Sequence, residues 1–469
     1  MIRRIKDLKI FPLAFAVVAV PFLLYLSFHR PYLFGQRNML AVAGLIVAAF
    51  IATLYESHFW TLFAAVFLWA GSIVPLAGQM QFLRWAMLGL AAFLALGFYA
   101  RTPGRLHFNY HHLLGFFTIV AAFASALVSV NPMLTALKVL SLTALFIYAV
   151  LGFRTLWGRT PEPFLGRICV FVEFLVYFTA ACYVVSFEVW GNLNSLGVIA
   201  GLLCWPILLW RFVIAKTRRE YLRYGLELAV CGYLIIWSES RASMLAAFLS
   251  SMLLLVSARR YRLLMVGLSL AAVGLGMVYL LAPERINRAK DNLLYKQGKQ
   301  YKGILQSREE PWKKSIASFQ QHPWLGFGFG VAETSAEWQV GFQTPGFQTR
   351  ERGSSYLTFL EGTGLIGAIP FGLLLVGLLM DAGKVFRWLR LTGKVNHPAI
   401  PAACLVVGGL FHAIFEDWLL AVGYYMSAIF WLIAFSLRDW MGCPRPINTQ
   451  QPVVMDEIPT IPEARLALR

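Results

Sequence analysis

The chain alternates long apolar runs with short polar breaks along most of its length. A membrane-spanning helix needs about 20 mainly apolar residues, because the bilayer core is about 30 Å thick. The pattern predicts an all-α, polytopic membrane helix bundle of about 14 (12–14) transmembrane helices with a long outward loop that contains short helices. The runs lie at 10–28, 38–55, 58–77, 82–100, 111–129, 133–153, 164–187, 193–215, 222–238, 241–258, 262–282, 355–381, 399–416 and 418–437.

The loops between these runs give the direction of each span. Lys and Arg in short loops mark the cytoplasmic side of a membrane. If the N-terminus is cytoplasmic, the inner loops hold most of the basic residues, and we therefore expect both termini to be cytoplasmic. The inner-loop residues are Arg101, Arg105, Arg154, Arg159, Lys216, Arg218, Arg219, Arg223, Arg259, Arg260, Arg262, Lys384, Arg387, Arg390 and Lys394.

The same pattern divides the chain into four parts. Residues 1–282 hold predicted helices 1–11, and residues 283–354 form a large outward loop. Residues 355–438 hold predicted helices 12–14. Residues 439–469 are rich in Pro and poor in apolar clusters, so we expect a disordered cytoplasmic tail. The turns at Glu239–Arg241 and Glu416–Asp417 are expected on the outward side with the large loop.

The composition agrees with a membrane protein and indicates how the positive net charge should be interpreted. The chain is 59% hydrophobic and 14% charged, whereas a soluble domain is about 25% charged. The net charge of +18 comes from loops between apolar runs, which favours a topology signal over nucleic-acid binding. Five of the six Cys lie inside apolar runs and none forms a CxxC pair, as is typical of lone buried thiols. The first apolar run has no small-residue cleavage site, so it is expected to remain as the first span.

The outward loop contains one segment with a helical pattern. Ser307 and Glu310 have capping-box spacing, and Pro311 is acceptable in a first helical turn. Pro323 ends the segment. The pattern predicts a short amphipathic helix that lies at the bilayer surface or packs on the span bundle. Its expected apolar face holds Trp312, Ile316 and Phe319, and its expected polar face holds Lys313, Lys314, Ser318 and Gln321.

Glycines alternate with aromatic residues directly after this segment, from His322 to Gly330. The pattern is not GxGxxG and no strand–helix unit surrounds it, which argues against a nucleotide-binding fold. Alternating Gly permits a tight backbone path with the aromatic side chains against lipid or ligand.

Several motifs in this order resemble the O-antigen ligase and polymerase superfamily over roughly residues 185–437. Arg308, Trp312 and the Gly326-x-Gly328-x-Gly330 run resemble its outward signature. The remaining motifs are Gly191-x-x-Asn194-x-x-Gly197, Ser238-Glu239-Ser240-Arg241-Ala242-Ser243, Ser355-Tyr356-Leu357 with Glu361-Gly362-Thr363-Gly364, and His412 with Phe415-Glu416.

The resemblance implies a metal-independent glycosyl-transfer enzyme without a cofactor, at the outer (periplasmic) face of the bacterial inner membrane. The donor would be a glycan on undecaprenyl diphosphate. The acceptor would be a lipid A core sugar, another glycan repeat or, less often, a protein, with membrane lipids around both. Ligases of this family carry a His just before the span that begins with the Ser-Tyr-Leu stretch. Residues 350–354 of this chain hold none.

Three residues are the candidate catalytic groups. Arg241 and Arg308 are candidates for holding the diphosphate leaving group during an inverting transfer, because Arg suits bidentate phosphate contact. The alternatives are a structural ion pair with Glu239 or headgroup contact for Arg241, and a solvated helix start for Arg308. His412 is the candidate general base, with a buried interhelical histidine as its alternative. The candidate substrate-binding residues are Arg350, Arg352, Glu361, Trp312, Asn194 and Glu416.

Rival functions remain open at this point. A polysaccharide polymerase that extends lipid-linked repeats is the alternative within the family, and the missing His favours it. A secondary transporter is the alternative from another class, with Glu173 and Glu227 as the main mid-span charges. A scaffold of an export machine is a third. The concentration of polar residues outside the spans favours surface chemistry over transport.

Overall fold

A computed structural model describes residues 81–101, 108–152, 162–186, 189–190, 192–281, 295–296, 299–300, 306–331, 353–422 and 424–441. These residues are almost entirely helical; two strands of two residues each, β1 (Tyr295–Lys296) and β2 (Lys299–Gln300), pair antiparallel. The helices are α5 (Gln81–Arg101), α6 (Tyr110–Ala124), α7 (Pro132–Ile147), α9 (Glu162–Val184), α10 (Leu193–Val198), α11 (Trp205–Ile214), α12 (Arg218–Trp237), α13 (Arg241–Ser257), α14 (Tyr261–Leu281), α16 (Gln306–Gln321), α18 (Ser355–Thr392), α19 (Ala399–His412) and α20 (Tyr425–Met441).

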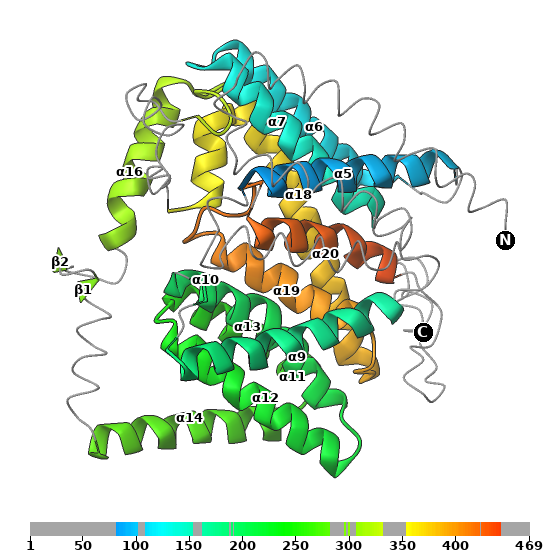
Figure 1. Ribbon diagram of the computed structural model, residues 1–469, viewed down its shortest axis with the longest axis vertical. Coiled ribbons are helices and arrows are strands. Elements are labelled where there is room, and N and C mark those ends of the chain that lie inside the picture. Colours follow the sequence, from blue (N-terminus) through cyan, green and yellow to red (C-terminus); the bar gives the residue numbers. More distant parts are fainter. Residues whose placement is uncertain are drawn as a thin grey trace.

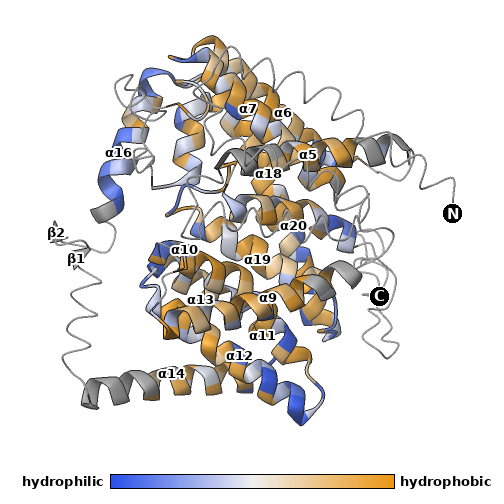
Figure 2. Cartoon of the chain, viewed as in Figure 1, coloured by the Kyte–Doolittle hydropathy of each residue, from blue (hydrophilic) through white to orange (hydrophobic). Residues whose placement is uncertain are grey.

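The helices form a bundle around α18, which packs against α6, α19 and α16. Helices α5, α6 and α7 lie on one side of it, and α9–α13 lie on the other side beyond α19 and α20 (Figure 1). Helix α16 and the β1–β2 hairpin lie at the left edge of the bundle in this view. Figure 2 shows that the bundle helices are mostly hydrophobic, whereas α16 is largely hydrophilic. Polar residues of the large loop therefore meet the apolar bundle where α16 packs against α18.

Length and apolar composition identify membrane helices within the described residues. Four helical stretches are long and apolar enough to cross a bilayer, namely Tyr110–Leu127, Pro132–Leu151, Leu193–Ile214 and Ser355–Thr392. Three of these include irregular turns: the 3₁₀ turn η2 (Ser125–Leu127) extends α6, the π-helical turn η3 (Tyr148–Gly152) extends α7, and the π-helical turn η4 (Ile199–Cys204) joins α10 to α11. The wider π turn leaves Ala200 with a carbonyl that accepts a hydrogen bond from the Cys231 thiol at 3.3 Å.

Every span predicted from 82–100 onward coincides with a described helix or helical stretch. The all-α membrane fold is thus confirmed for this part of the chain. The predicted spans at 10–28, 38–55 and 58–77 lie outside the described residues, as does the tail from 442, so the number of spans stays a prediction.

The predicted boundary between the last two spans was wrong. Helix α19 ends at His412 instead of 416, and α20 begins at Tyr425 instead of 418. The chain between them is irregular because Ser355 binds it. The Ser355 hydroxyl donates to the Glu416 carbonyl at 2.8 Å and accepts from the Trp418 and Leu419 amides at 3.0 Å each. A helix through this segment would use those backbone groups itself.

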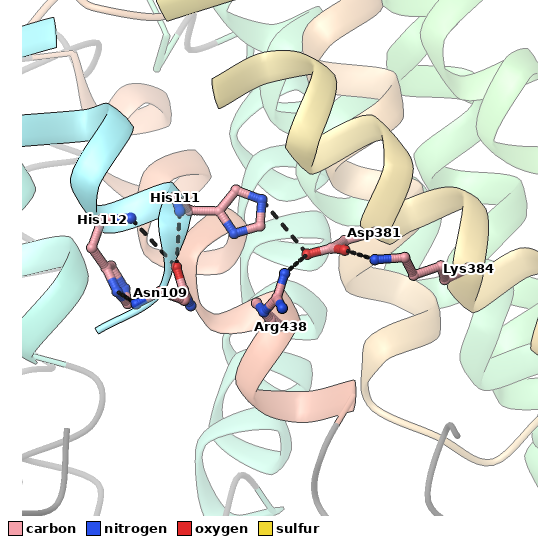
Figure 3. A network of polar contacts seen from close by, with 6 residues as sticks. All are labelled: Asn109, His111, His112, Asp381, Lys384 and Arg438. Atoms are coloured by element: carbon pink, nitrogen blue, oxygen red, sulfur yellow. Dashed lines mark hydrogen bonds and ion pairs between the residues drawn. The ribbon is translucent and has the colours of Figure 1, made fainter. Parts of the chain in front are cut away.

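The far end of α18 meets the start of α6 and the end of α20. The Asp381 carboxylate receives Lys384 Nζ at 2.7 Å and Arg438 Nη1 at 3.4 Å, and His111 Nε2 lies 3.6 Å away (Figure 3). These helix ends were predicted to share one side of the membrane, and Arg308 and Glu416 meet at the opposite ends. The alternation of span directions therefore agrees with the structure. Which side is cytoplasmic stays a prediction.

Candidate functional site

Helix α16 brings Arg308 to the end of the bundle where Glu416 lies, which is the predicted outward end. Arg308 is 9% exposed, and its Nη2 lies 2.5 Å from Glu416 Oε1. The two residues are far apart in the sequence: Arg308 lies in the first turn of α16, and Glu416 lies in the irregular segment after α19. The Glu416 side chain is 24% exposed, so this pair is open at one side. An Arg beside a partly open carboxylate can also face a bound anion.

The packing face of α16 was predicted in part. Trp312 and Phe319 are partly buried and Lys313, Lys314 and Gln321 are exposed, as expected, but Ile316 and Ser318 were assigned to the wrong faces. Ile316 is 42% exposed, whereas Ser315 and Ser318 are 1% and 2% exposed. The buried face thus combines Arg308 with small serines, and Ser318 belongs to it instead of to the solvent face. Small side chains on this face allow α16 to pack against α18, and Ile316 is left exposed. The helix packs on the bundle, as one of the two expectations for it required.

Trp312 fixes the start of α18 beside Arg308. Its indole Nε1 donates to the Gly353 carbonyl at 3.1 Å, and its ring lies 6.3 Å from that of Phe415. Gly353 has φ +69°, and a Cβ there would lie 3.3 Å from Arg308 Cδ. A side chain at position 353 would be strained and would press on the guanidinium arm. Trp312 is therefore part of the support of Arg308. Arg350 and Arg352 lie outside the described residues.

His412 connects three helices through both of its ring nitrogens. Trp418 Nε1 donates to Nδ1 at 2.9 Å, and Nε2 lies 3.1 Å from Ser243 Oγ. Because Nδ1 accepts a hydrogen bond, Nε2 carries the proton and donates it to Ser243. The side chain is 0% exposed. These contacts favour the interhelical interpretation of His412 over the general base.

Arg241 begins α13 on the same end of the bundle. It follows Ser240, whose hydroxyl lies 2.9 Å from that of Ser243. The packing of this turn depends on Gly197, where a Cβ would lie 2.6 Å from Ser240 Cβ. The turn that carries Arg241 is therefore held against α10 and, through Ser243 and His412, against α19.

Asn194 lies in the first turn of α10, close to Gly197 in the sequence. Its amide N–H is capped by the Asn192 side chain at 2.8 Å. The motif around Asn194 therefore contacts the Arg241 turn through Gly197. The family resemblance gave only the order of these two motifs along the chain.

The Gly-aromatic segment fills a break in α18. Helix α18 has non-helical backbone at Gly364, with φ +59°. The amides of Phe327 and Gly328 donate to the carbonyls of residues 361 and 362 at 3.0 Å each, and the amides of residues 365 and 366 donate to the carbonyls of residues 323 and 324 at 2.8 and 3.2 Å. The backbone groups that the break leaves open are thus satisfied by another segment.

Glycine is required on both sides of this contact. A Cβ at Gly326, which has φ +67°, would lie 2.4 Å from the Glu361 carbonyl oxygen. A Cβ at Gly364 would lie 2.3 Å from Trp324 backbone. The expected tight backbone path is confirmed, and one aromatic side chain in it, Phe329, is buried against the ring of Phe359 at 5.9 Å. Trp324 is 66% exposed.

Glu361 lies inside this break and is 1% exposed. Its carbonyl is one of those bound by the Gly-aromatic segment, so its backbone position is fixed. The Gly-aromatic segment follows α16 in the chain, so this contact joins the element that carries Glu361 to the one that carries Arg308.

Two residues of this region were missed by sequence reasoning. Ser355 was read as part of a family motif, yet its hydroxyl organises the segment that carries Glu416. Lys138 donates from Nζ to the Gly330 carbonyl and so ties the Gly-aromatic segment to α7. A lone Ser at a helix start and a lone Lys within a helix give no local signal, because their partners are distant in the chain.

The two mid-span carboxylates considered for a transporter, Glu173 and Glu227, both pair with Arg223. Arg223 bonds Glu227 from Nε at 3.2 Å and also contacts Glu173 through Nη2. The Tyr177 hydroxyl lies 3.4 Å from Glu227. This cluster joins α9 to α12 and lies apart from the Arg308 end of the bundle. Within the residues described, no group of three or more His, Cys, Asp or Glu is placed to hold a metal ion.

One family model matches part of the chain. No curated protein matches the chain. Residues 226–372 match the family model described as O-antigen ligase. The matched segment runs from α12 to the middle of α18 and includes Arg241, Arg308 and the Gly-aromatic segment. The match supports the resemblance of this membrane protein to the O-antigen ligase and polymerase superfamily.

Proposed function

We propose that the protein transfers a glycan from an undecaprenyl-diphosphate carrier to an acceptor hydroxyl at the outward face of the bacterial inner membrane. One observation carries the proposal. The family match covers residues 226–372, and the basic side chain that this segment buries at the outward end, Arg308, lies beside the partly open carboxylate of Glu416.

Arg308 and Arg241 supply positive charge for the leaving group. In an inverting transfer the acceptor oxygen attacks the anomeric carbon, the bond from that carbon to the diphosphate oxygen breaks, and the lipid diphosphate leaves with the electron pair. Guanidinium groups that are already fixed stabilise this charge without reorganising. The packing of α16 on α18 fixes Arg308, and the Ser240–Ser243–His412 contacts fix the turn of Arg241.

Ligase and polymerase differ in the acceptor. A ligase would use a lipid A core sugar, and a polymerase would use another lipid-linked repeat. The sequence from Arg350 to Ser354 lacks the His that ligases of the family carry there, and this favours the polymerase as the second candidate.

Single Arg308→Ala and Arg241→Ala variants test the proposal in a strain that lacks the native gene. Both should abolish surface glycan attachment or chain extension, while membrane levels of the protein stay normal. Lys313→Ala is the matched control, because Lys313 lies on the same helix with its side chain 79% exposed. Normal surface glycan from both Arg variants would refute the proposal. Accumulation of single lipid-linked repeats would identify a polymerase, and accumulation of lipid-linked polymer would identify a ligase.

A further inference from the structure

The proposed transfer needs a group that accepts the proton of the acceptor hydroxyl. His412 is 0% exposed with both nitrogens engaged, and Glu361 is 1% exposed. Glu416, at 24%, is the most exposed of the three. A general base must come within hydrogen-bond reach of the proton it takes, so Glu416 fits this requirement and the other two do not.

The backbone around Glu416 is fixed although its side chain is open. Its carbonyl accepts from the Ser355 hydroxyl at 2.8 Å, and the Phe415 amide donates to the His412 carbonyl at 3.0 Å. His412 and Ser355 therefore act as positioning residues for this turn. A carboxylate on a fixed turn can be held close to a reacting atom, which a surface side chain on a mobile loop cannot.

The Arg308 contact occupies Glu416 in the free protein. The guanidinium lies 2.5 Å from Glu416 Oε1, where an acceptor hydroxyl would otherwise approach that oxygen. The diphosphate of the donor would compete for the same guanidinium N–H groups and carries more negative charge than one carboxylate. Occupation of Arg308 by the donor would thus release the Glu416 oxygen that faces Arg308.

Resting on the proposed function, we propose that Arg308 exchanges Glu416 for the donor diphosphate and that the released Glu416 carboxylate accepts the proton of the acceptor hydroxyl. The acceptor oxygen forms a bond to the anomeric carbon, and the bond from that carbon to the diphosphate oxygen breaks. The hydroxyl proton goes to Glu416, and the lipid diphosphate leaves with the bonding electron pair. Arg308 returns to Glu416 once the diphosphate has left and the proton has passed to water. The exchange makes a competent base only when donor is present.

Binding and transfer measured separately test this exchange. The probe is polyprenyl-diphosphate-linked glycan extracted from cells that lack the protein, with membranes of the same cells as acceptor. Glu416→Gln should bind this donor as tightly as the wild type or more tightly, and its single-turnover transfer should fall about 100-fold or more. Arg308→Ala should lose donor binding. Glu310→Gln is the control. Glu310 is an exposed acid on α16, the helix that carries Arg308, and it pairs with Lys314 at 2.7 Å.

Two results would overturn the exchange. One is transfer by Glu416→Gln within about threefold of the wild type. The other is loss of donor binding in Glu416→Gln to the extent seen in Arg308→Ala, which would make Glu416 a support of Arg308 only. If Glu416→Gln fails to reach the membrane, Glu416→Asp decides: slow transfer with normal binding supports the exchange, and full transfer overturns it. A wild-type protein that transfers nothing from lipid-linked glycan would instead refute the proposed function.

Discussion

Two carboxylates that contact an Arg lie at opposite ends of the bundle, and they are built differently. Asp381, on α18, is 1% exposed and is approached by Lys384, Arg438 and His111 from three helices. Glu416, at the other end, is 24% exposed and pairs with Arg308. The first carboxylate is enclosed by its partners, whereas the second keeps one side open.

The difference separates a structural use of charge from a chemical one. Removing one member of an enclosed cluster leaves a buried charge without compensation and lowers the free energy of unfolding. A partly open pair contributes less to stability, because solvent competes for both groups. The open pair can exchange its partner at little cost, and this is what a site for a charged leaving group needs.

A reversed pair at the outward end should have the largest effect. The double variant Arg308→Glu with Glu416→Arg can rebuild an ion pair, yet it moves the positive charge to another backbone position. Transfer should stay reduced about 1,000-fold, because electrostatic preorganisation of the leaving group is lost. Thermal stability in detergent should lie close to that of the wild type. Recovery of transfer would show that the pair acts structurally, as at Asp381.

Asp381→Asn should show the opposite profile. The amide keeps the shape of the side chain but loses the charge that Lys384 and Arg438 approach. Because these two cations are partly exposed, we expect a loss of about 2 kcal/mol in the free energy of unfolding, below the value for a fully buried pair. Transfer per folded molecule should be unchanged. A transfer defect without a stability loss would assign this inner cluster a role in the reaction.

Mild acid should affect the inner end through His397, which lies in the segment between α18 and α19. Burial lowers the pKa of His397 to about 4, and Nδ1 accepts from the Ala399 amide at 3.2 Å. The unfolded chain binds a proton below about pH 6.5, and the folded protein binds one only near pH 4. His397 therefore leaves the free energy of unfolding unchanged above pH 6.5. Between pH 6.5 and pH 4 it lowers the free energy of unfolding as the pH falls, by about 2 kcal/mol at pH 5.

Replacing His397 isolates this contribution. A His397→Gln variant should be less stable at neutral pH and should lose that part of the decrease between pH 6.5 and pH 5 in thermal unfolding. An unchanged pH dependence in the variant would assign the decrease to other groups.

The sequence predicts the helices of this fold well, because an apolar run of sufficient length has few alternatives in a bilayer. It also identifies α16 and places Arg308 in its first turn. It fails where distant contacts decide. Ile316 is exposed and Ser318 is buried because close packing on α18 favours small side chains. The end of α19 depends on Ser355, and the meeting of Arg308 with Glu416 depends on how the helices pack. No local pattern contains that information.

The insertion of the Gly-aromatic segment into α18 has a consequence for protein engineering. Residues 323–328 provide the hydrogen bonds that the first turns of α18 lack at residues 361–366. The outward helix α16 and the beginning of α18 are thus one interchangeable module, bounded by α16 at one end and the helix break at the other. A chimera that takes residues 306–331 from a relative and leaves the native break in place keeps these bonds only where the incoming backbone follows the same path. Grafts intended to alter acceptor choice should therefore exchange residues 306–366 together.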